Sequence, residues 1–66
     1  MRIFFNGQAH EIEAQATIAT LLQRFQLEPR YVAVEVNLQL IPRDRHDQHV
    51  LQADDRLEVV TLVGGG

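Results

Sequence analysis

The sequence contains no cysteine, serine, lysine or tryptophan among its 66 residues. Without cysteine, disulfides, iron–sulfur clusters and zinc sites built on thiolates are excluded. The missing lysine also excludes the phosphate-binding loop of the GxxxxGK[ST] type. The remaining side-chain nucleophiles are threonines, one tyrosine, histidines and carboxylates. None of them stands in a recognisable catalytic arrangement, so we expect that the chain is not itself an enzyme.

Basic charge and long apolar runs are lacking as well. The net charge is −3 at pH 7, and this argues against nucleic acid, which needs a basic surface to neutralise its phosphates. No apolar run approaches the ~20 residues of a membrane span, and no secretory signal is recognisable at the start. Hydrophobic residues make up 45% of the chain. We therefore expect one cytoplasmic domain over residues 1–66 with a hydrophobic core.

The hydrophobic pattern predicts a hairpin followed by a helix. Residues 2–6 are typical of a strand that stops at Asn6-Gly7, the strongest short signal for a hairpin turn. An alternating return strand is predicted at about 9–14. In residues 18–26 the apolar positions share one helical face, and Thr17 is the natural N-cap.

The second half of the chain predicts further strands. They are expected at 31–36, 40–41, 50–51 and 56–62, with a charged surface connection at 43–48. One helix covering one face of a sheet is an α+β architecture. In the last strand, alternation turns Leu57 and Val59 inward and leaves Glu58, Val60 and Leu62 outward. In the first strand it leaves Phe4 on the outer face.

A metal site is the alternative interpretation of the charged connection. His46 and His49 are three residues apart, a spacing that places two imidazoles toward one metal ion if the segment is helical. Asp44 and Asp47 lie beside them, but no third ligand is clearly placed. The pattern favours a solvated charged loop, and we expect no metal.

The glycines at 64–66 suggest a different kind of site. Residues 62–66 are expected to form a flexible tail, and Gly64 and Gly65 have no Cβ to obstruct passage through a narrow channel. A carboxylate on Gly66 is ionised at pH 7, so it can attack the α-phosphate of ATP. The alternative is a frayed end or an expression remnant with no function.

These segments together resemble a known family. The segments that carry the resemblance are Ile3-Phe4-Phe5-Asn6-Gly7, Asn37, Ile41-Pro42-Arg43, Asp54-Asp55-Arg56-Leu57 and Val63-Gly64-Gly65-Gly66. The whole chain is similar to the ThiS family, the ubiquitin-like sulfur carriers of thiamine (thiazole) biosynthesis. The resemblance implies a β-grasp fold with a mixed sheet of four to five strands and one main helix packed on one face.

The resemblance also implies a chemistry that takes place on partner proteins. A ThiF-like adenylating enzyme of the ubiquitin-activating type would use MgATP to adenylate the Gly66 carboxylate. A cysteine desulfurase system, as persulfide donor, would convert it to a thiocarboxylate. A ThiG-like thiazole synthase would then take the sulfur. The chain itself would bind no cofactor.

Two alternatives remain open. The small subunit of molybdopterin synthase has the same fold, tail and thiocarboxylate chemistry, although members of that family are usually longer. A ubiquitin-like modifier or plain interaction domain would instead use the terminal carboxylate for isopeptide linkage, or not at all.

A docking surface is expected beside the tail. If the first and last strands pair in parallel, as the resemblance implies, Phe4, Val60 and Leu62 lie on adjacent strands of the outer face. We interpret them as a partner-docking patch with Glu58 at its rim, because uncovered apolar side chains reduce solubility. The alternative is an ordinary scatter of exposed apolar residues.

Overall fold

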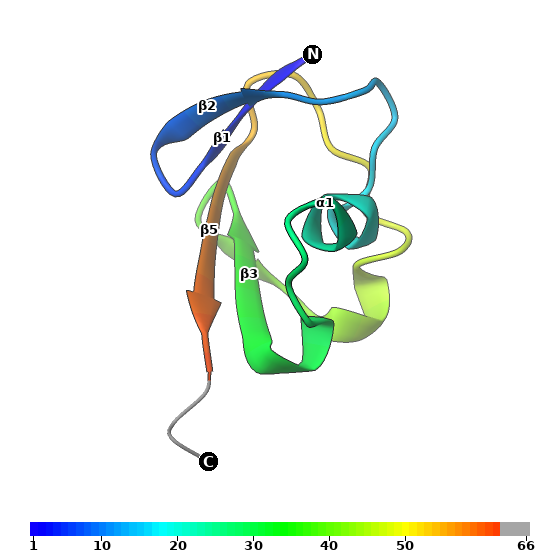
Figure 1. The fold of residues 1–66 in the computed structure, drawn as a ribbon, viewed down its shortest axis with the longest axis vertical. Coiled ribbons are helices and arrows are strands. Elements are labelled where there is room, and N and C mark those ends of the chain that lie inside the picture. The colour runs from blue at the N-terminus through cyan, green and yellow to red at the C-terminus, as the bar shows by residue number, and fades with distance from the viewer. Residues whose placement is uncertain (63–66) are drawn as a thin grey trace.

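A computed structural model describes residues 1–62 of the chain. Within this range five strands form one mixed sheet in the order β2-β1-β5-β3-β4 (Figure 1). The strands are β1 (Arg2–Phe5), β2 (Gln8–Glu11), β3 (Val32–Val36), β4 (Gln39–Ile41) and β5 (Arg56–Thr61). β1 and β5 pair in parallel at the centre, and the other pairs are antiparallel. The predicted α+β fold with a mixed sheet is confirmed.

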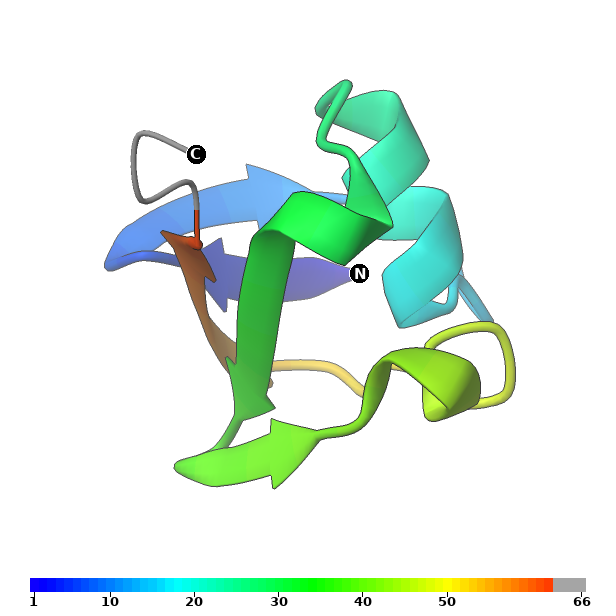
Figure 2. The same cartoon turned by 90° about the horizontal axis from the view of Figure 1, so that it is seen from below.

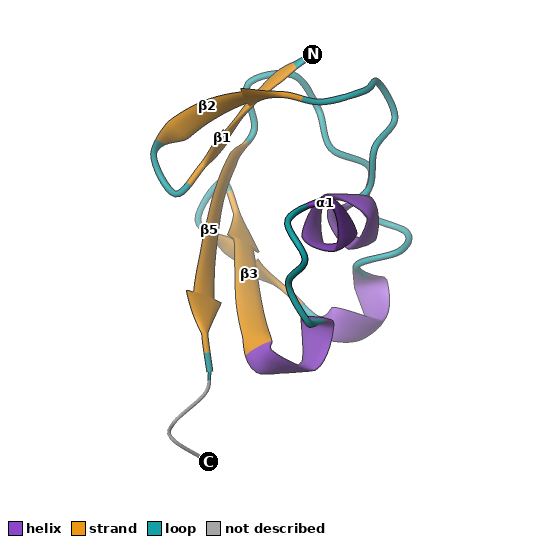
Figure 3. Ribbon diagram, in the orientation of Figure 1, coloured by secondary structure: helices purple, strands orange, loops and turns teal. Residues whose placement is uncertain are grey.

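The helix α1 (Ile18–Arg24) lies on one side of this sheet (Figure 2). Thr17 is the N-cap, as predicted, and its Oγ1 accepts a hydrogen bond from the Thr20 amide at 3.2 Å. The helix ends two residues earlier than predicted, with Phe25 as its C-cap and Gln26 in the left-handed region at φ 59°. Short 3₁₀ helices at Pro29–Tyr31 and Arg43–Arg45 complete the regular structure (Figure 3).

The core lies between α1 and the inner face of the sheet. It combines the apolar face of the helix with alternate residues of the strands, as the period-2 and helical patterns predict. Its buried members are Ile3, Ile12, Ala16, Ile18, Leu21, Leu22, Val32, Val34, Val36, Ile41, Leu51, Leu57 and Val59.

The hairpin forms at Asn6-Gly7 as predicted, with both residues at positive φ, 50° and 85°. The predicted strand at 50–51 is wrong, because Val50 makes only an isolated bridge to Thr17. Its neighbour Leu51 is drawn into the core at 1% exposure instead. The backbone of this segment bonds to the chain before α1 instead of to the sheet, since the Leu51 amide donates to the Ala16 carbonyl at 2.8 Å.

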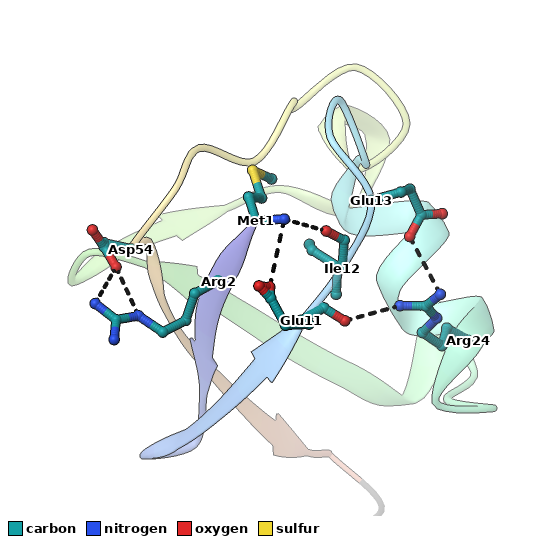
Figure 4. Close-up of polar contacts among 7 residues, drawn as sticks. All are labelled: Met1, Arg2, Glu11, Ile12, Glu13, Arg24 and Asp54. Atoms are coloured by element: carbon teal, nitrogen blue, oxygen red, sulfur yellow. Dashed lines mark hydrogen bonds and ion pairs between the residues drawn. The ribbon is translucent and has the colours of Figure 1, made fainter.

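Polar contacts attach the β1–β2 hairpin to the rest of the domain (Figure 4). Arg2 donates through Nε and Nη2 to Asp54 Oδ1, at 3.0 and 2.8 Å. Arg24 of α1 donates to the Glu11 carbonyl and lies 3.4 Å from a Glu13 carboxylate oxygen. These pairs are exposed, and exposed ion pairs contribute about 0–1 kcal/mol each to stability.

Candidate functional site

The last strand presents one face to the core and one to the outside. Leu57 and Val59 are 1% and 9% exposed, whereas Val60 and Leu62 are 57% and 60% exposed. Glu58 is also exposed. The predicted faces of β5 are therefore confirmed, and the side chains assigned to the docking patch on this strand all point away from α1.

Asn6 holds the middle of β5 in place. Its side-chain Oδ1 accepts a hydrogen bond from the Val59 amide at 2.8 Å, and its Nδ2 donates to the Val59 carbonyl at 3.1 Å. The backbone amide of Asn6 also donates to the Leu57 carbonyl at 2.8 Å. The side-chain amide thus substitutes for the next peptide group of β1, which has turned away into the hairpin.

The end of β5 is paired on its other side. Thr61 lies opposite Val32 in β3, and the Leu62 amide donates to the Tyr31 carbonyl at 2.6 Å. Leu62, the first residue of the predicted tail, is therefore still bonded to the body of the domain. The rest of the predicted tail, which includes Gly64, Gly65 and Gly66, lies outside the described residues.

A polar network fixes the start of β5. The Asp55 carboxylate accepts hydrogen bonds from the Gln52 amide at 2.8 Å and from Asn37 Nδ2 at 3.0 Å. Asn37 Oδ1 in turn accepts from the Arg56 amide at 3.0 Å. A turn at residues 53–54 precedes β5, and Asp55, which follows it, is buried at 8% exposure. Its two donors compensate for the lost hydration of the carboxylate.

Phe4 lies apart from the other apolar members of the predicted docking patch. It is half-buried, and the guanidinium carbons of Arg2 and Arg56 lie 5.1 and 4.9 Å from the centroid of its ring. The parallel pairing is as expected, but its register sets Phe4 against Arg56. Val60 is four residues further along β5, roughly 13 Å at ~3.3 Å per residue. Along β5, Arg56 and Glu58 lie between Phe4 and Val60 on the outer face, and Phe4 shares a hollow with Leu38 of the β3–β4 turn.

The apolar neighbours of Val60 come from the opposite side of β5. Val60 is directly paired with Ala33 of β3. A shallow hollow on this face, here called the outer hollow, is lined by Ala33, Glu35, Leu38, Leu40, Glu58 and Val60. Leu38 and Leu40 are 89% and 61% exposed. They were not predicted as part of the docking patch. The alternation of Leu40 with the buried Ile41 is the signal that places Leu40 on the outer face.

The charged connection at 43–48 is not wholly solvated, and the prediction is wrong for His46. This side chain is 4% exposed, with Nε2 3.1 Å from the Ile41 carbonyl oxygen. The carbonyls of His46 and His49 accept the first helical amides, those of Ala19 and Ile18. The segment therefore caps α1 through its backbone and inserts one imidazole beneath it.

Among residues 1–62 no group of three or more metal-ligating side chains is found, nor a helix long and apolar enough to cross a membrane.

A mixed sheet with parallel central strands, one helix across its inner face and a final central strand that leads out toward a glycine run defines a ubiquitin-like β-grasp protein. The model of the ThiS family matches residues 3–66. The chain belongs to the ThiS family.

Relatives and solved structures agree with this assignment. The chain is 32% identical to the sulfur carrier protein ThiS of Escherichia coli, over the full length of both. It superimposes on the crystal structure of the thiamine biosynthesis protein ThiS from Geobacter metallireducens with a TM-score of 0.86, at 25% identity and full coverage of both chains.

Two other relatives are much longer proteins. The chain is 42% identical to a thiazole synthase of Magnetococcus marinus and 35% identical to one of Paramagnetospirillum magneticum. All of the chain is matched in each case, but it spans only 20% of the length of either relative.

Proposed function

We propose that the chain is a sulfur carrier of thiamine biosynthesis, with the Gly66 carboxylate as the carrying group. The observation that carries this proposal is the full-length match to a sulfur carrier protein ThiS. The geometry is consistent with it, because β5 leads from the centre of the sheet to Leu62, immediately before Val63-Gly64-Gly65-Gly66 in the sequence.

The reaction requires a partner that activates the carboxylate. In an adenylating enzyme of the ubiquitin-activating type, a carboxylate oxygen of Gly66 attacks the α-phosphorus of MgATP and displaces pyrophosphate. The outer sulfur of a persulfide fed by a cysteine desulfurase then attacks the acyl-adenylate and displaces AMP. The acyl disulfide that forms is cleaved by a thiol, which is oxidised to a disulfide as the thiocarboxylate is released. Gly64 and Gly65 bring this group into the partner's active site, since residues without Cβ atoms pass a narrow channel.

Thiazole synthase is the proposed acceptor of the sulfur. Support comes from the two relatives named thiazole synthase, each of which contains a segment similar to this whole chain. The chain acts as a co-substrate in this scheme, and catalytic groups and MgATP belong to its partners. The names of the relatives favour the thiamine pathway over molybdopterin synthesis.

Intact-mass spectrometry of the protein purified from its own cells tests the proposal. We expect a fraction of the chain to carry the mass increase of one oxygen-to-sulfur exchange, located at Gly66 by fragmentation. The fraction should disappear when the cysteine desulfurase gene is deleted. A Gly66 carboxylate found only in isopeptide linkage would instead identify a ubiquitin-like modifier.

A further inference from the structure

Two glutamates face each other on the outer side of the sheet. Glu35 of β3 is paired directly with Glu58 of β5. In this antiparallel ladder the Asn37 amide donates to the Arg56 carbonyl and the Leu62 amide to the Tyr31 carbonyl. Hydrogen-bonded pairs recur every second residue, so Glu35 and Glu58 form one too, with Cα atoms ~5.5 Å apart. Their side chains emerge side by side from the same face of the sheet.

This arrangement is unfavourable in the free protein. Like charges directly opposite each other on a sheet destabilise it, and neither carboxylate forms an ion pair within the part of the chain that the structure describes. Each of the four ion pairs within residues 1–62 involves other groups. Arg56, two residues from Glu58 on the same face, has its guanidinium over the Phe4 ring instead. An external cation would remove the repulsion.

The side chains around the two carboxylates indicate which kind of cation would bind there. Both line the outer hollow, whose other walls are aliphatic: Ala33, Leu38, Leu40 and Val60. A long side chain that ends in a cation buries its methylene groups against such walls while its charged end reaches the carboxylates. A guanidinium presents five N–H donors in a plane and can bridge two carboxylates, whereas an ammonium acts as a point charge. Arginine fits this combination better than lysine.

We propose that the outer hollow receives an arginine side chain of thiazole synthase, with Glu35 and Glu58 as its ligands. The inference rests on the proposed function, which makes thiazole synthase the acceptor of the sulfur. The charge complementarity supplies the specificity of docking, and the exposed leucines and Val60 supply the apolar contact.

The direct test compares two pairs of neutralised carboxylates in titrations against purified thiazole synthase of the same organism. The double variant Glu35→Gln/Glu58→Gln should bind at least ~10-fold more weakly than the parent chain at low salt. The control Asp44→Asn/Asp47→Asn removes the same charge from exposed positions beyond β4 and should change affinity less than ~2-fold. Equal effects of the two double variants, or no effect of either, would overturn the proposal.

Thermal melts supply a second readout. If the glutamates stabilised the fold, their replacement would lower the melting temperature, whereas relief of repulsion raises it. Glu35→Gln and Glu58→Gln should each raise the melting temperature of the free chain, because each relieves the same repulsion. The double variant should gain little beyond either single change, since the two sites are coupled. A lower melting temperature for the single variants would contradict the repulsion on which the proposal depends.

The absence of cysteine allows the arginine itself to be located. A photo-cross-linker attached to Leu40→Cys labels this position alone, because the chain has no other thiol. The cross-linked synthase peptide should contain or adjoin an arginine whose replacement by alanine reproduces the loss of affinity, with partial recovery by lysine. A cross-link to the adenylating enzyme but not to the synthase would overturn the choice of occupant.

Failure of the docking proposal is distinguishable from failure of the proposed function. If the thiocarboxylate is found by mass spectrometry but the synthase binds parent and Glu35→Gln/Glu58→Gln chains equally, only the arginine site is wrong. If no thiocarboxylate forms and the parent chain does not bind the synthase, the proposed function fails and the docking proposal fails with it.

Discussion

The side chain of Asn6 and the backbone of Val59 form a two-hydrogen-bond pair across the centre of the sheet. The pair continues the parallel β1–β5 ladder past the point where β1 turns into the hairpin. It holds β5 three residues before Leu62, the last residue that the structure describes. Asn6 is therefore both a turn residue and the lateral support of the strand that leads to the proposed carrier end.

Replacing Asn6 with alanine should destabilise the domain. The Val59 amide and carbonyl would lose their partners in a partly buried position, a cost of ~1–3 kcal/mol. Alanine is also disfavoured at the φ of 50° that Asn6 adopts. Urea unfolding measures the change, and Gln8→Ala, an exposed position of the same hairpin, is the control. Equal unfolding free energies for Asn6→Ala and the parent would show that the two hydrogen bonds contribute nothing.

Leu22→Ala should reduce the free energy of unfolding by ~2–5 kcal/mol, the usual range for emptying a buried aliphatic position. Leu22 lies on the face of α1 that packs against the sheet, and it has 0% exposure. A domain of this size has only a few kcal/mol of net stability, so we expect a substantial unfolded fraction at room temperature. Circular dichroism melts should show no such loss for Gln23→Ala, the next and exposed helical position.

Deleting Gly66, or extending the chain past it, should leave the fold unchanged and abolish adenylation. Glycine has no side chain to contribute to the core, whereas the position of the terminal carboxylate determines whether it reaches the α-phosphate of ATP. A thermal melt verifies folding, and ATP–pyrophosphate exchange with the adenylating enzyme measures activation. Normal exchange by the shortened chain would contradict the role proposed for Gly66.

Val60→Asp should weaken binding to the adenylating enzyme by 10-fold or more, about 1.4 kcal/mol. In the proposed function the adenylating enzyme and thiazole synthase both act on the Gly66 carboxylate, so we expect the outer face to be used by each in turn. A charge at Val60 must be desolvated when the surface is covered, but it leaves the core intact because Val60 is 57% exposed.

The matched control for this prediction is Val59→Asp, one residue earlier on the same strand. Val59 is only 9% exposed and faces the core, so its replacement should unfold the domain. A titration of the folded Val60→Asp chain, run beside melts of both variants, separates docking from stability. Unchanged affinity would exclude Val60 from the interface.

Sequence patterns that depend on near neighbours predicted the fold well. The helical spacing of Ile18, Leu21 and Leu22 and the capping chemistry of Thr17 act within one or two turns. The positive φ values required at Asn6-Gly7 are equally local, and so is the alternation that separates Leu57 and Val59 from Val60. Each of these patterns reflects the backbone geometry of a few neighbouring residues. A single sequence is therefore sufficient to recognise it.

Only the tertiary structure decided the features that depend on which segments meet. His46 is buried because its segment packs against the start of α1, and Asp55 because Asn37 and the Gln52 amide supply it with donors. The register between β3 and β5 sets Glu35 against Glu58, and that of β1 against β5 separates Phe4 from Val60. A shift of one residue in either register would reverse which side chains share a face. The sequence by itself determined the helix, the five strands of the sheet to within a few residues and their inner and outer faces, because these follow local periodicity. Long-range pairing determined which charges and apolar groups lie together on the outer face.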